Sequence, residues 1–339
     1  AWAAGGLAPE VAWLLGKDGC EAFETLQPAP PQASASRLFQ QGGYAVMRSG
    51  WEPDAHQLLL DVGPLGCPFS SGHGHTDLLS VQCATFGEAR LVDPGTYCYT
   101  AEPRWRNHFR GSHAHNTVVV DGEDQAIPTG PFSWLDKPQA RVSHWISTPK
   151  FDFIDAEHEA YKRLSDPVTH RRRVLFVKPH YWILVDDLYG SDVHRIELLF
   201  QFAPSPVILD PNGWTVCSNS SGAGLLLRSF ASCDIKAQIK EGDVEPIAGW
   251  VSPDYGVREP APLLVYSTES LLPLRIVTLL LPRSEENTAI PDITFGSEKM
   301  QMNFVTGCET LRIDDKQIIV ERAQGEKIIP IQSADGVVQ

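Results

Sequence analysis

Histidines concentrate in one part of this 339-residue chain, where five of the eleven lie between residues 71 and 125. Four of them form two similar pairs, Gly72-His73-Gly74-His75 and Ser112-His113-Ala114-His115. Between the pairs, Asp93 directly follows a short apolar run. Neutral imidazole is the commonest metal ligand in proteins, and a carboxylate completes a donor set that suits zinc. Two histidines and one aspartate with an open fourth position therefore predict a zinc centre.

The two histidines of each pair are two residues apart, which is the side-chain repeat of a β-strand. Alternate side chains of a strand share a face, so each pair would direct both imidazoles into one space. On this expectation His113 lies on the same side as His115 and is a candidate fourth ligand. The alternative for any one of these histidines is an ordinary packed or solvated side chain.

The composition limits the classes of function. The net charge of -14 argues against nonspecific nucleic-acid binding, which needs a basic face. A local basic surface for an acidic sugar is compatible with that charge. No apolar run approaches the roughly 18 residues of a membrane span. The sequence opens Ala-Trp-Ala-Ala without Met, so we expect a processed N-terminus, and a periplasmic or secreted location is the working expectation.

The seven cysteines are widely spaced and contain no Cys-x-x-Cys motif. We expect small buried thiols, with one or two disulfides as the alternative.

The chain divides into a short helical part and a long strand-rich part. Residues 1–28 repeat apolar side chains at helical intervals, but they are too few to fold alone and are predicted to be the remnant of a helical domain. A proline-rich linker follows at 29–36. Residues 37–282 are predicted to form the main β domain, and 283–339 a small C-terminal β region.

Repeated short apolar strands separated by Gly, Pro and Asp turns predict the fold class, which is mainly β: an antiparallel β-sandwich of several sheets with a short N-terminal helical remnant. Gly87-Glu88 and Asp121-Gly122 are predicted turns. The expected strands are 44–48, 57–62, 78–86, 89–92, 117–121, 172–177, 181–185, 195–202, 225–230, 263–267, 274–281 and 317–322.

Four blocks of the sequence together resemble the C-terminal β-sandwich region of heparinase II/III-like polysaccharide lyases. The order and spacing of the first three match that family, and the resemblance covers about Phe39 to Leu281. The blocks are Gly72-His-Gly-His-Thr-Asp77, Leu91-Val-Asp-Pro-Gly-Thr-Tyr97, His115-Asn-Thr-Val-Val-Val-Asp-Gly122 and Tyr181-Trp-Ile-Leu-Val-Asp-Asp187.

The resemblance implies an α/α-toroid followed by β-sandwich sheets, and cleavage of uronic-acid glycosides by β-elimination. It also implies zinc, with His75, Asp93 and His115 as ligands, and a catalytic role for His73 toward the substrate carboxylate. The zinc is expected to be structural, because β-elimination needs no metal-bound hydroxide. The family's other catalytic groups lie on the toroid, which this chain almost wholly lacks. We therefore expect either a fragment of a longer lyase or a stand-alone sandwich without turnover.

Candidate substrate contacts lie between the histidine pairs. The run from Arg104 to Arg110 alternates cations with aromatic residues, which suits a carboxylated sugar, and Arg110 and Arg106 are the favoured contacts. A solvated loop is the alternative. Tyr97 near Asp93 is a further candidate contact, with packing as its alternative role. The cluster at 171–173 is expected to be a solvated strand edge.

Three functions are compared. The first is a lyase acting on an acidic polysaccharide together with a toroid domain absent from this chain. The second is a noncatalytic carbohydrate-binding or structural β-sandwich, and self-association into a homodimer is left open for either. A cupin-like metal hydrolase is disfavoured, because cupin histidines follow a more compact pattern.

Overall fold

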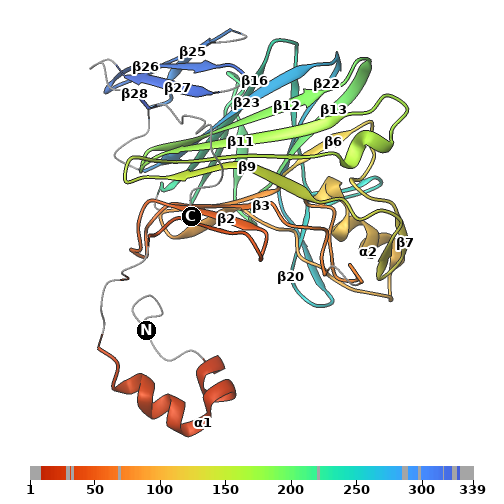
Figure 1. The fold of residues 1–339 in the computed structure, drawn as a ribbon, viewed down its shortest axis with the longest axis vertical. Helices are drawn as coiled ribbons and strands as arrows, with labels where there is room; N and C mark the ends of the chain where they lie inside the picture. Colours follow the sequence, from red (N-terminus) through yellow and green to blue (C-terminus); the bar gives the residue numbers. More distant parts are fainter. Residues whose placement is uncertain are drawn as a thin grey trace.

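Antiparallel strands dominate the structure, which confirms the predicted fold class (Figure 1). The computed structural model describes residues 9–27, 31, 34–67, 70–219, 222–284, 289–296, 299–315, 317–322 and 327–328. Helix α1 (Pro9–Glu24) breaks at Gly16, whose φ is 64°, and it buries none of its side chains. Residues 1–8 of the predicted helix and much of the predicted linker lie outside the described residues. Neither α-helix in the described part is long and apolar enough to cross a bilayer.

An eight-stranded sheet forms the middle layer of the molecule (Figure 1). Its central strands carry continuous apolar runs because both of their faces are covered; β12 has eight buried residues in succession. In spatial order the strands are β14 (Val207–Leu209), β15 (Thr215–Ser218), β16 (Gly224–Ala231), β23 (Leu274–Arg283), β12 (Tyr181–Tyr189), β11 (Thr169–Val177), β10 (Phe151–His158) and β9 (Ala140–Ser147).

Two smaller sheets cover one face of this layer and enclose the main hydrophobic core with it. In that core the Trp182 ring is fully buried and stacks on Phe176 at 4.5 Å between centroids. The first sheet contains β1 (Arg37–Phe39), β2 (Tyr44–Arg48), β3 (Gln57–Asp61), β4 (Val81–Thr85) and β5 (Glu88–Leu91). The second contains β17 (Lys236–Lys240), β22 (Leu263–Leu271), β13 (Val193–Gln201) and β6 (Val118–Val120).

A C-terminal sheet packs on the opposite face and closes a second core, so the sandwich has three layers. Its strands are β24 (Asp292–Phe295), β25 (Lys299–Phe304), β26 (Gly307–Ile313), β27 (Ile318–Arg322) and β28 (Lys327–Ile328). Three hairpins complete the described strands: β7 (Pro128–Gly130) with β8 (Ser133–Trp134), β18 (Asp243–Val244) with β19 (Ile247–Ala248), and β20 (Trp250–Asp254) with β21 (Val257–Pro260).

Three local expectations differ from the structure. The run from Arg104 to Arg110, for which a solvated loop was the alternative, is the helix α2 (Pro103–Arg110), which begins at a proline. The turn between β4 and β5 is centred on Phe86 and Gly87, both with positive φ, and β5 already begins at Glu88. The cluster at 171–173 is not a solvated edge, because β11 lies between β10 and β12.

The strand expectation for the histidine pairs was also wrong. Residues 73–75 lie in a loop, and His113 belongs to a short 3-10 helix (Ser112–Ala114). A second 3-10 helix covers Ala160–Arg163. All seven cysteines are unpaired, which confirms free thiols over disulfides. The expected burial holds for Cys83, Cys98 and Cys217, whereas Cys67 and Cys308 are exposed.

Candidate metal centre

Four side chains from three separate segments converge at one point. One ligand atom from each of His75, Asp77, Asp93 and His115 lies within 4.8 Å of all the others. His75 Nδ1 is 3.2 Å from His115 Nε2, and the same Nε2 is 3.5 Å from Asp93 Oδ2. A tetrahedral zinc with bonds of about 2.0–2.1 Å separates its ligand atoms by about 3.3–3.4 Å. The two measured spacings are close to that edge length.

The hydrogen bonds of the two imidazoles leave the inner nitrogens available for a cation. His115 is fully buried, and its Nδ1–H donates to the Gly111 carbonyl at 2.7 Å, so its Nε2 carries the lone pair. His75 Nε2 lies 3.4 Å from the Thr96 hydroxyl, which suits an N–H at that position. With these tautomers two lone pairs face each other across 3.2 Å, an arrangement that a metal ion stabilises.

The pKa shifts of the clustered side chains also favour binding of a cation. Burial, followed by the charges of His115 and Arg106, lowers the pKa of His75 well below its usual value, so the imidazole stays neutral. Burial, followed by the charges of Asp61 and Asp93, raises the pKa of Asp77 well above its usual value. Neutral imidazoles and crowded carboxylates both favour binding of a divalent cation.

The backbone around the ligands is fixed by side-chain amides rather than by strand pairing alone. The amide of Asn116, next to His115, donates to the carbonyls of Val81 at 2.6 Å and of Val92 at 2.9 Å. The buried amide of Gln125 accepts from the N–H of Leu78 and donates to its carbonyl. The segments that carry Asp77, Asp93 and His115 are therefore tied to one another.

His73 is exposed beside this cluster and touches a strip of aromatic rings. Its ring meets Tyr99 edge-on at 5.2 Å and lies 5.8 Å from Phe132. Tyr99 is also 5.5 Å from Phe132 and 5.8 Å from Tyr255, which is 63% exposed. This aromatic strip (His73, Tyr99, Phe132 and Tyr255) offers ring faces of the kind that pack on pyranose rings.

Arg106 and Arg110 lie behind the strip, on the buried side of α2. The guanidinium of Arg110 donates to the carbonyls of Gly130 and Pro131 and lies 4.4 Å from the centroid of Trp134. Arg106 lies 5.1 Å from the ring centroid of Tyr99 and is 1% exposed. Burial, followed by the charge of Arg106, lowers the pKa of Arg110 to about 10. Arg106 and Arg110, the two predicted substrate contacts, thus supply positive charge from the buried side of α2, which forms a wall behind the aromatic strip.

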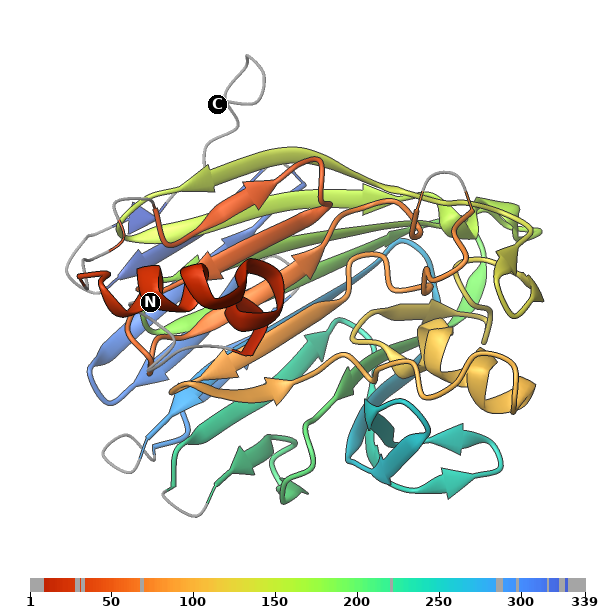
Figure 2. The same ribbon diagram turned by 90° about the horizontal axis from the view of Figure 1, so that it is seen from below.

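Tyr97, the third predicted substrate contact, is 8% exposed and adopts a φ of 62°. Its hydroxyl donates to Glu102, and its ring packs against Phe109 and under Arg258. Trp105 of α2 also meets Trp250 of the β20–β21 hairpin at 5.3 Å, and Figure 2 shows α2 and the hairpin side by side at one end of the molecule. The geometry of Tyr97 favours packing.

His113 points away from the four-ligand cluster. Its Nδ1 lies 3.4 Å from Asp124, and it lines a separate cavity of about 520 Å³ together with Arg195 and Glu197. Asp77 takes the fourth place in the cluster instead. Sequence reasoning missed Asp77, although it stands two residues after His75 in the first histidine block.

Residues 31–291 match the family model of the heparinase II/III-like C-terminal region. The chain belongs to this family. It is 26% identical over 199 residues to a heparin-sulfate lyase of Bacteroides stercoris and 22% identical over 214 residues to one of Pedobacter heparinus. These matches cover 58% and 62% of this chain but only 27% and 30% of the relatives.

Solved structures support the same fold. A heparan sulfate lyase from Pedobacter heparinus superimposes with a TM-score of 0.71 at 18% identity, over 97% of this chain and 46% of that protein. A structure described as a heparinase III gene product gives a TM-score of 0.69 at 21% identity, over 94% of this chain and 44% of the other. The chain therefore spans less than half the length of these heparinase-family relatives.

Proposed function

We propose that this chain is the β-sandwich portion of a polysaccharide lyase that cleaves uronic-acid-containing polymers by β-elimination. The observation that supports this most is the position of the exposed His73, which belongs to the aromatic strip and lies two residues from the converging side chains of His75 and Asp77, in a chain of the heparinase II/III-like family. The curated relatives named above are heparin-sulfate lyases, and their substrate class suggests an acidic polysaccharide here.

β-Elimination removes the proton beside the uronate carboxylate, and the 4-O glycosidic bond then breaks. The C–H is too weak an acid unless the growing charge on the carboxylate is offset. His73 can donate a hydrogen bond to that carboxylate from the surface, while Arg106 adds positive charge from behind Tyr99 and Arg110 from beside Trp134. The rings of Tyr99 and Tyr255 can hold the apolar face of a sugar. The base and the acid of the reaction are not among these residues.

Zinc is the cation that best fits the proposed centre, because the donor set is two imidazoles with carboxylates and no thiolate. His75, Asp77, Asp93 and His115 would hold it. When bound, it would supply positive charge and fix the loops that present His73. His73 itself is two residues from His75, so an ordered loop would set its orientation toward the substrate.

Activity is tested by the ultraviolet absorbance of the unsaturated uronates that β-elimination produces. The complete translated chain would be assayed on heparan sulfate, alginate and other uronate polymers. We expect absorbance to rise on at least one polymer, and His73→Ala to lower the rate by about 10²–10³. His113→Ala is the matched control and should leave the rate unchanged, since His113 faces Asp124.

A noncatalytic carbohydrate-binding domain is the second candidate, and the exposed rings of Phe132 and Tyr255 favour it. No absorbance rise on any polymer, combined with polymer binding that Tyr255→Ala weakens, would replace the lyase proposal by this one.

A further inference from the structure

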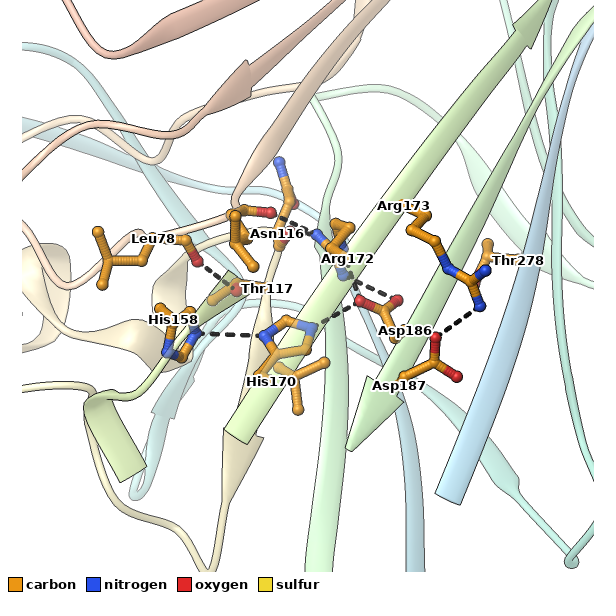
Figure 3. A network of polar contacts seen from close by, with 12 residues as sticks. Leu78, Asn116, Thr117, His158, His170, Arg172, Arg173, Asp186, Asp187 and Thr278 are labelled. Atoms are coloured by element: carbon orange, nitrogen blue, oxygen red, sulfur yellow. Dashed lines mark hydrogen bonds and ion pairs between the residues drawn. The ribbon is translucent and has the colours of Figure 1, made fainter. Parts of the chain in front are cut away.

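Two consecutive arginines of β11 are completely buried and point to opposite faces of the eight-stranded sheet (Figure 3). Arg172 faces the main core and pairs with Asp186, its direct neighbour across the β11–β12 ladder. Arg173 faces the second core, where it pairs with Asp187 and donates to the carbonyl of Asp314, which directly follows β26 of the C-terminal sheet. The two residues are therefore alike in burial and charge pairing, but they contact different layers.

Arg172 reaches the backbone of the metal-centre loops. Its Nε and Nη2 donate to the two carboxylate oxygens of Asp186 at 2.7 and 3.1 Å. Its Nη1 donates to two carbonyls, that of Leu79 at 2.6 Å and that of Asn116 at 2.8 Å. Leu79 lies two residues after Asp77, and Asn116 directly follows His115. One guanidinium thus holds two ligand-bearing segments against the sheet.

The partners of Arg172 are themselves fixed. His170 Nε2–H donates to Asp186 at 2.7 Å, and His170 Nδ1 accepts from Nε2–H of His158 at 3.2 Å. His158 Nδ1 then accepts from the N–H of Ala160. Burial alone would raise the pKa of Asp186, but the Arg172 charge and the His170 contact lower it to about 2. One set of neutral tautomers satisfies this whole row of buried groups (Figure 3).

The third ligand segment joins the same assembly through Asn116. The side-chain amide of Asn116 donates to the carbonyl of Val92, the residue before Asp93, while the backbone carbonyl of Asn116 accepts from Arg172. Arg172 is therefore connected by hydrogen bonds to the segments that carry Asp77, Asp93 and His115. Its hydrogen bonds go to the Asp186 carboxylate and to backbone carbonyls, not to the side chains of the four candidate ligands, so metal binding would leave them intact.

We propose that Arg172, braced by Asp186, is a positioning residue that sets the geometry and affinity of the metal centre from the eight-stranded sheet. The inference rests on the metal centre proposed above and deepens it. A lysine at this position keeps a positive charge opposite Asp186 but cannot reach both carbonyls and the carboxylate at once. The backbone beside Asp77 and His115 would then relax independently.

The test compares Arg172→Lys with Arg173→Lys in the full chain. Zinc affinity is measured by competition with a chelator, and the cobalt-substituted protein is followed by its visible absorption spectrum. We expect Arg172→Lys to weaken zinc binding by about 10–100-fold and to alter the cobalt spectrum. Arg173→Lys should lower the melting temperature to a similar extent while leaving affinity and spectrum as in the wild type.

The possible results distinguish a failure of the positioning role of Arg172 from a failure of the proposed metal centre. Equal zinc affinity and equal spectra in the two folded variants would overturn the positioning role of Arg172. Failure of the wild type to bind zinc or cobalt would instead overturn the proposed metal centre. If Arg172→Lys does not fold, Asp186→Asn and Asp187→Asn replace the pair, because each keeps the side-chain shape; the first withdraws the charge opposite Arg172 and the second the charge opposite Arg173 and Arg275. Only Asp186→Asn should weaken zinc binding.

Discussion

At the scale of single residues, the two histidines of the second pair have different surroundings. His115 is fully buried and 3.2 Å from the His75 ring nitrogen, whereas the His113 side chain is 40% exposed and faces Asp124. We predict that His115→Ala weakens zinc binding by more than about 100-fold, since a ligand matters more than its supporting groups. His113→Ala should bind zinc as the wild type does. Metal analysis after dialysis against limited chelator measures both.

The four candidate ligands show which parts of a metal site can be predicted from residue patterns and which cannot. His75, Asp93 and His115 were selected with the help of a family resemblance, and the structure brings them together with Asp77. The strand argument for the pairs failed, because neither pair lies in a strand and the alternation of side chains therefore does not apply. Asp77 could have been found by its place two residues after His75. The burial of Arg172 could not have been predicted in this way, since three successive arginines usually mark a solvated surface.

At the scale of elements, helix α2 builds the wall behind the aromatic strip through its buried arginines. Arg110→Gln would remove the side-chain donor to the Gly130 carbonyl, at a cost of about 1–3 kcal/mol for the unsatisfied group, and one of the two donors to the Pro131 carbonyl, which also accepts from Arg106. We therefore predict that the free energy of unfolding falls by that order, as measured by urea denaturation.

Arg104 is the matched control on the same helix. Its side chain is 57% exposed and pairs with Glu245, which is 79% exposed. Surface pairs of this kind contribute little, so Arg104→Gln should change the unfolding free energy by less than about 0.5 kcal/mol. Equal losses in the two variants would show that the buried contacts of Arg110 do not stabilise the wall.

The elements also separate what periodicity predicts from what it misses. Strands β12 and β23 were expected because most of their residues are apolar. Helix α2 was missed, because its buried face is made by Arg106, Phe109 and Arg110 rather than by aliphatic residues. A helix whose buried side is cationic carries no apolar stripe for a pattern to detect.

At the scale of the whole molecule, a buried histidine links three segments that are distant in sequence. His194 on β13 bonds Asp121 at 2.7 Å and Asp166 at 2.9 Å, and so joins the turn after β6 to the loop before β11. Burial would lower the pKa of His194, but the hydrogen bonds to Asp166 and Asp121 outweigh it and raise the pKa. The charged form is therefore the one that folding favours.

The sign of the pH effect follows from that shift. A group with a raised folded pKa stabilises the protein fully below its unfolded pKa, about 6.5 for histidine, and loses this contribution as pH rises through the folded value. We predict that the melting temperature of His194→Gln is furthest below that of the wild type near pH 6, and that the gap narrows toward pH 9. A gap that widens with pH would contradict the assignment.

The layered architecture was only partly predictable. The sandwich of antiparallel strands follows from short apolar runs and turn residues. The third layer does not, because a continuous apolar run indicates a strand buried on both faces but does not say which part of the chain covers the second face. Arg173 joins the two layers, because it pairs with Asp187 in its own sheet and also donates to the Asp314 carbonyl next to β26, and such contacts depend on strand register rather than on local sequence.

The most direct measurement of the central claim is X-ray absorption at the zinc edge on the metal-loaded wild-type protein. We predict one tightly held zinc whose ligands are two imidazole nitrogens and otherwise only oxygen atoms, at distances of about 2.0–2.2 Å. A sulfur neighbour at about 2.3 Å would place the metal on a cysteine instead. That result, or a protein that holds no zinc at all, would contradict the convergence of His75, Asp77, Asp93 and His115 on a single ion.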